Sequence, residues 1–162
     1  MSDSIFSIDV EDWFNLSGTG AEPPPSEWDR LESRLRRNFH GLLELLAEGT
    51  AKARAGAIEE FPITAVRVFG KPMCFFGGGY LRLFPYSVIR AMGRRALGEG
   101  RPVIFYVHPR EIDPAQPRMA LSRRRRFTCY VNLESTRPKI RRILRDFRVT
   151  SFERYMSQRT VQ

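Results

Sequence analysis

The residues of this sequence best suited to chemistry are a cluster of acids and a distant histidine. Asp9, Glu11 and Asp12 follow a short apolar segment typical of a strand, and His108 directly follows the apolar run VIFYV. In α/β folds, reactive groups gather beyond the carboxyl ends of the strands. Carboxylates can hold a divalent cation or accept a proton, and an imidazole can protonate a leaving amine. The pattern therefore indicates metal-assisted hydrolysis.

The same residues also fit a purely structural interpretation. An acidic string such as DVED after a strand is typical of a solvated turn or a helix cap. A single histidine at the end of a strand also occurs often in proteins in which it neither binds a metal nor transfers a proton. Both interpretations stay open on the residue types alone.

Alternating helical and extended patterns predict an α/β fold as the framework for these residues. The first amphipathic helix is expected to begin at Ser26 as its N-cap. The other expected elements are a strand over 4–9, a loop over 15–26, a strand over 63–69, a helix over 85–97, a strand over 103–108, an exposed loop over 109–126, a basic helix over 136–147 and a short strand over 149–152.

Composition limits the class of protein. The 162 residues are 42% hydrophobic and 28% charged, which is typical of a single folded domain. No apolar run approaches the roughly 20 residues that cross a bilayer, and the acidic start is unlike a secretory signal, so a cytoplasmic location is expected. Cys74 and Cys129 have no CxxC partner, which argues against a zinc ribbon or a disulfide framework.

The net charge of +9 favours association with polyanions. Arg123–Arg126 and the arginine-rich helix near the C-terminus make a basic nucleic-acid-binding module an alternative function. No recognised nucleic-acid-binding motif accompanies these arginines, so specific nucleic-acid binding is not expected.

Several longer strings point to a family. The opening SIDVEDWF, the helical LLELLAEGTAKA, and then EEFPITAVRVFG, GGGYLRLFPY, RPVIFYVHPREIDPAQPR and RRFTCYVNLESTRPKIRRILRDF follow one another along the chain. In this order they resemble the polysaccharide deacetylase family, specifically the bacterial subgroup linked to exopolysaccharide and exosortase gene clusters. The resemblance covers most of the chain.

The resemblance implies an irregular (β/α) barrel and removal of N-acetyl groups from an N-acetylated polysaccharide or oligosaccharide with a divalent metal, usually zinc. It implies that Asp9 is the general base for the attacking water and that His108 protonates the departing amine. It makes Asp12 the first choice of metal-binding carboxylate, with Glu11 as the competing ligand because the acids are spaced differently from the usual adjacent aspartates.

The sequence departs from this family in its middle. The family's pair of metal-binding histidines four residues apart has no counterpart, because His40 and His108 are the only histidines and His40 is expected on a helix surface. We therefore expect a single truncated domain over 1–162, with an N-terminal part over 1–53, a C-terminal part over 58–162 and an internal deletion near 50–58.

Such a truncation has three expected consequences. Zinc binding and deacetylase activity should be weak, since catalytic zinc normally has three protein ligands. Sheet edges exposed by the missing strands could cause self-association. A noncatalytic carbohydrate-binding or scaffold remnant is the alternative to an enzyme.

Overall fold

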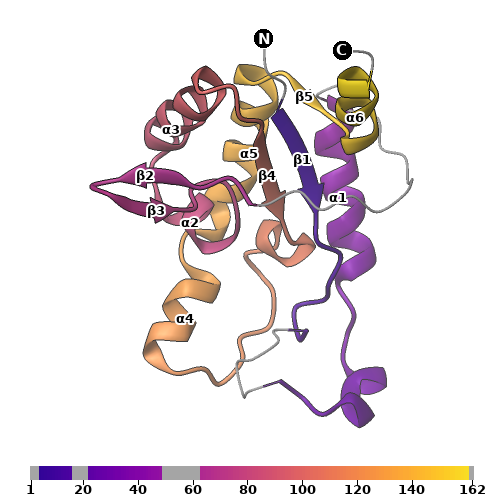
Figure 1. The fold of residues 1–162 in the computed structure, drawn as a ribbon. Coiled ribbons are helices and arrows are strands. Elements are labelled where there is room, and N and C mark those ends of the chain that lie inside the picture. Colours follow the sequence, from indigo (N-terminus) through magenta and orange to yellow (C-terminus); the bar gives the residue numbers. More distant parts are fainter. Residues whose placement is uncertain (1–3, 16–21, 49–62, 161–162) are drawn as a thin grey trace.

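A computed structural model describes residues 4–15, 22–48 and 63–160 of the chain (Figure 1). These residues form a mixed α/β fold with short strands and more numerous helices. In chain order the elements are β1 (Ser4–Ile8), the 3-10 helix η1 (Pro25–Arg30), α1 (Leu35–Glu48), β2 (Val66–Val68), β3 (Lys71–Met73), α2 (Gly78–Leu83), α3 (Tyr86–Gly98), β4 (Val103–Val107), η2 (Pro109–Ile112), α4 (Arg123–Tyr130), η3 (Leu133–Ser135), α5 (Thr136–Asp146), β5 (Val149–Thr150) and α6 (Phe152–Thr160).

The principal sheet has the strand order β4-β1-β5, and both pairings are parallel. In Figure 1, α1 lies beside β1, whereas α3, α5 and the antiparallel β2–β3 hairpin lie on the β4 side. The carboxyl ends of β1 and β4 therefore open at the same end of the sheet. The expected strands at 4–9, 103–108 and 149–152 are confirmed in position, each slightly shorter than predicted.

A hydrophobic core fixes this arrangement, because burial of apolar side chains is the main force that holds the helices on the sheet. Val103, Phe105 and Val107 alternate with less buried neighbours along β4 and are fully buried. They pack in a cluster that also contains the following side chains from the surrounding helices and loops: Leu42, Leu45, Phe76, Ile89, Ile140, Ile143 and Phe147.

The first amphipathic helix begins later than the sequence predicts. Ser26 lies within the short η1 helix, and α1 begins only at Leu35. The interruption follows from contacts that the local pattern does not reveal, since Asp12 accepts hydrogen bonds from the Ser33 hydroxyl and the Arg34 backbone N–H. A long-range contact thus determines where the helix starts.

The exposed loop predicted over 109–126 is present only in its middle, over 113–122, because a helix occupies each end. Pro109 begins the buried η2 helix, where a proline is tolerated because the first backbone N–H of a helix needs no partner. Arg123 then begins α4, whose four arginines are compatible with a helix that stays on the surface. The strand predicted over 63–69 is reduced to Val66–Val68.

The described residues show an open sheet in linear strand order, so the (β/α) barrel is not shown. The expected deletion near 50–58 lies outside the described residues. In the part of the chain that is described, no helix combines the length and the apolar character needed to cross a membrane. Cys74 and Cys129 are both free and half-buried, and do not form a disulfide.

Candidate active site

The first and fourth strands bring the predicted base and acid together. The β1–β4 register pairs Ile8 with Val107, and the Asp9 backbone N–H donates to the Val107 carbonyl at 3.0 Å. Because the strands are parallel, the residues that follow them emerge side by side. Asp9 and His108 are therefore neighbours although they lie far apart in the sequence.

The His108 imidazole faces two carboxylates. Its Nε2 atom lies 3.4 Å from Asp9 Oδ2 and 3.6 Å from Glu11 Oε1. One ligand atom from each of Asp9, Glu11 and His108 lies within 4.8 Å of the others. Three oxygen and nitrogen donors in this space match the ligand number and the ligand types of catalytic zinc sites. The donor set thus fits a divalent cation.

A buried ion pair holds the other side of the imidazole. Glu111 is almost completely buried, and its Oε2 atom accepts a hydrogen bond from the His108 backbone N–H at 3.1 Å and lies 3.5 Å from His108 Nδ1. Its Oε1 atom lies 3.1 Å from Nε of the buried Arg82. A carboxylate behind a histidine orients the ring and makes its opposite nitrogen a better ligand.

The groups around His108 shift the pKa values of His108 and of Glu111. Burial lowers the pKa of His108, but the nearby carboxylates Glu111 and Glu11 outweigh this effect and place the pKa above its ordinary value. Burial raises the pKa of Glu111, but its hydrogen bond with His108 and the charge of Arg82 bring it below the usual range. Glu111 is therefore an anion that favours a proton on the imidazole.

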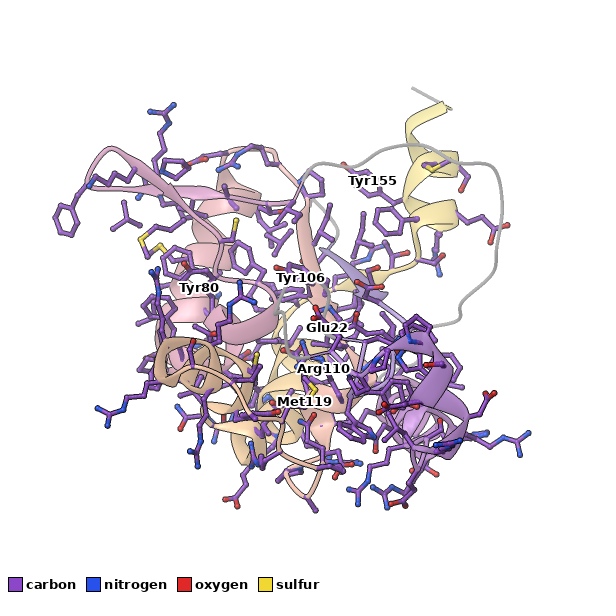
Figure 2. The ribbon with its side chains drawn as sticks, turned by 90° about the horizontal axis from the view of Figure 1, so that it is seen from below. Glu22, Tyr80, Tyr106, Arg110, Met119 and Tyr155 are labelled. Atoms are coloured by element: carbon purple, nitrogen blue, oxygen red, sulfur yellow. The ribbon has the colours of Figure 1, made fainter. Side chains whose placement is uncertain are left out.

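Arg110 positions the second carboxylate of the cluster. Its Nε atom donates to Glu11 Oε1 at 3.1 Å, and its side chain is almost entirely buried. Figure 2 looks onto the end of the sheet where β1 and β4 finish, with Arg110 near the centre of the view. The contact holds Glu11 toward His108, and it also competes with a cation for the same oxygen.

Asp12 does not join the cluster. Its Oδ1 atom accepts hydrogen bonds from the backbone N–H groups of Trp13, at 2.9 Å, and Arg34, at 3.2 Å, and its Oδ2 atom accepts one from the Ser33 hydroxyl. The side chain is buried, with 5% exposure. The structure therefore places the preferred metal ligand of the sequence analysis in a capping position and places its competitor, Glu11, beside His108.

Sequence reasoning missed the residues behind the histidine. Arg82, Arg110 and Glu111 were not singled out, because charged residues between prolines suggest an exposed loop. The spacing of His108 and Glu111, which places a carboxylate three residues after the histidine, was the one available signal. His40 is exposed on α1, as expected.

The glycines at the start of α2 pack closely against β4 near the candidate site. Gly77 pairs with Tyr106 in an isolated parallel bridge, and a side-chain carbon at Gly77 would lie 2.1 Å from the Tyr106 ring. Gly78 has a φ of +52°, which favours glycine. These glycines let the chain pass close to β4, just before His108.

The fold and this cluster define a mixed α/β protein with a carboxylate–imidazole centre at the carboxyl ends of parallel strands. The chain belongs to the family described as a domain of unknown function, DUF3473, which matches residues 34–157. His108 and Glu111 lie inside the matched region, whereas Asp9 and Glu11 precede it. No curated protein and no solved structure matches the chain.

Proposed function

We propose that this protein is a polysaccharide deacetylase-like hydrolase that removes N-acetyl groups from carbohydrate, at a low rate, during exopolysaccharide biosynthesis. The single observation that carries the proposal is the contact of Asp9 and Glu11 with His108 at the ends of two adjacent parallel strands. DUF3473 is a domain associated with polysaccharide deacetylase-like proteins, which supports the same class. The finer fold assignment, a fragment of a (β/α) barrel, is part of this proposal.

Each residue of the cluster has a role that its position allows. Asp9 is the most exposed of the three, with 68% side-chain exposure, and can take a proton from a water that approaches from solvent. Glu11 replaces Asp12 as the metal-binding carboxylate. A bound divalent cation, zinc by the family resemblance, would polarise the N-acetyl carbonyl.

His108 has two uses that exclude each other. Its Nε2 atom can complete the set of three donors around a cation, or it can carry the proton that the departing amine requires. A proton and a cation cannot occupy the same nitrogen at once. Because the chain lacks the pair of metal-binding histidines expected from the resemblance, we expect this conflict to make turnover slow.

The test is acetate release from a hexamer of N-acetylglucosamine with added Zn²⁺. We expect slow, zinc-dependent release that falls at least about tenfold in Asp9→Asn and in His108→Ala, since acid-base groups typically contribute more than this. Glu44→Gln, which removes an exposed carboxylate from α1, is the matched control and should leave the rate unchanged. Release that survives in both site variants, or no release above a protein-free blank, contradicts the proposal.

A further inference from the structure

A shallow, open groove beside α4 combines basic and aromatic side chains. It has a volume of about 500 Å³ and is lined by Arg118, Arg123, Arg126, Phe127, Tyr130 and Val131. A smaller apolar hollow of about 210 Å³ adjoins it and shares Phe127 and Val131. Phe127 is 55% exposed, which leaves one large apolar side chain in solvent between the two hollows.

The walls of this groove are held in place by contacts from the neighbouring loop. The Arg118 guanidinium carbon lies 4.3 Å from the centre of the Tyr130 ring, and the Tyr130 hydroxyl accepts a hydrogen bond from the Met119 backbone N–H at 3.0 Å. Arg118 also donates to the Pro114 carbonyl at 3.2 Å. One arginine is thus fixed before any ligand arrives.

Positive charge in the groove is not neutralised from within the protein. Among the described residues, Arg118, Arg123 and Arg126 form no ion pair with a carboxylate. An arginine fork binds a carboxylate through two parallel hydrogen bonds, and an exposed aromatic side chain packs on the apolar face of a sugar ring. The groove therefore suits a glycan that bears carboxylates.

A chain of buried contacts connects the groove with the candidate active site. Arg82 donates to the carbonyls of Thr128, at 3.0 Å, and Cys129, at 2.7 Å, near the end of α4. The same guanidinium pairs with Glu111, which contacts His108. In Figure 1, α4 lies toward the end of the molecule at which β1 and β4 finish.

We infer that this groove, defined by the six residues above, binds an acidic N-acetylated polysaccharide and so sets the substrate class of the proposed deacetylase, on which the inference rests. Nonspecific strand binding needs a basic track that follows several phosphates, whereas Arg124 and Arg125 of the same helix lie outside the groove.

Binding can be tested without catalysis. The probe is a fluorescent hexasaccharide of alternating glucuronate and N-acetylglucosamine, titrated with the full chain in the presence of EDTA. We expect Arg123→Gln/Arg126→Gln to weaken binding at least about tenfold, which is the effect of one lost charge-assisted contact. The matched variant Arg124→Gln/Arg125→Gln removes the same charge and should change affinity less than about twofold.

One further variant and one further ligand separate the effect of the arginine geometry from that of charge alone. Arg123→Lys/Arg126→Lys keeps the charge but loses the planar fork, and should also weaken binding by several-fold. The neutral hexamer of N-acetylglucosamine should bind at least about tenfold more weakly than the acidic one. These variants are on an exposed helix face, and a thermal unfolding curve confirms that each is folded.

Three outcomes would overturn the inference. Equal losses in both glutamine variants would mean that only net charge matters. Tighter binding of single-stranded DNA with the same number of charges would mean that the groove is a nucleic-acid site. Equal affinity for the neutral hexamer would exclude an acidic ligand. If the unchanged chain binds the acidic hexasaccharide but releases no acetate with added Zn²⁺, the proposed reaction is rejected and the groove stands.

Discussion

At the carboxyl end of β4 the charged side chains are buried and paired, whereas on α4 they face solvent. Arg82 and Glu111 have side-chain exposures of 2% and 1% and lie within 3.1 Å of each other, behind His108. Arg123–Arg126, by contrast, are all exposed. Buried pairs fix geometry because they cannot move without losing their partners, while Arg123 and Arg126 line an exposed hollow that a ligand can reach. The first region thus positions chemistry, and the second is suited to recognition.

The largest effect is expected from breaking the buried pair. Glu111→Ala would leave Arg82 buried without its carboxylate, and should lower the free energy of unfolding by about 3–5 kcal/mol. Chemical denaturation followed by circular dichroism measures this change. The double variant Arg82→Met/Glu111→Leu removes both charges but also the Arg82 hydrogen bonds to the Thr128 and Cys129 carbonyls, so it should recover only part of the loss. Equal losses in the single and double variants would show that the pair itself is not the cause.

A second buried carboxylate, Asp113, ties η2 to α1. It lies 3.0 Å from Arg34 and 2.8 Å from Arg37, and accepts a hydrogen bond from Asn38. Burial raises the pKa of Asp113, but the hydrogen bonds from Arg34 and Asn38 outweigh this effect and bring the pKa below 3.8. Its stabilisation is therefore complete above pH 3.8 and is lost as the pH falls through the lower, folded-state pKa.

Asp113→Asn should consequently cost about 1.5–3 kcal/mol at pH 7, which is the range for hydrogen bonds to charged groups. The variant should also be less sensitive to acid than the parent chain. Unfolding free energies measured between neutral pH and strongly acidic pH test both statements. Parallel pH curves for the two proteins would contradict this account of Asp113.

The third prediction compares the contributions of Asp12 and Glu11 to the free energy of unfolding. Asp12→Ala removes one hydrogen bond from Trp13 and two from Ser33 and Arg34 near the start of α1, and should lower the free energy of unfolding by about 1–2 kcal/mol. Glu11→Gln should have a smaller effect, because Glu11 is partly exposed and the substitution only weakens its ion pair with Arg110. A larger loss in Glu11→Gln would reverse the assigned roles. Thermal and chemical unfolding of the two variants decide between them.

The smallest effect is expected on α4. Arg124→Gln/Arg125→Gln should change the free energy of unfolding by less than about 0.5 kcal/mol, as is usual for exposed positions. A loss of several kcal/mol would show that α4 depends on these arginines for its folding. In that case the contrast between a positioning region and a recognition region would fail.

The sequence predicts those parts of the molecule that depend on local pattern. The apolar runs before Asp9 and His108 identify both strands, and the parallel arrangement of such strands predicts that the two residues approach each other. The apolar spacing in 136–147 likewise predicts α5. These features need only the neighbouring residues.

Other features depend on contacts between distant residues. Asp12 leaves the cluster because Ser33 and Arg34 provide its hydrogen-bond donors, and no pattern near Asp12 reveals them. Glu111 is buried because Arg82, distant in the sequence, neutralises it. Charged residues bordered by prolines are typical of exposed loops, so the local signal around η2 predicts the opposite of what the fold does.

The central claim is that Glu11 and His108 hold one divalent cation beside Asp9, and Zn²⁺ titration calorimetry at pH 7 tests it most directly. We predict one zinc site per chain, weakened at least about tenfold by Glu11→Gln and by His108→Ala, and changed less than about twofold by Asp12→Asn. Zinc affinity that is lost in Asp12→Asn, or that is unchanged in His108→Ala, would contradict the claim.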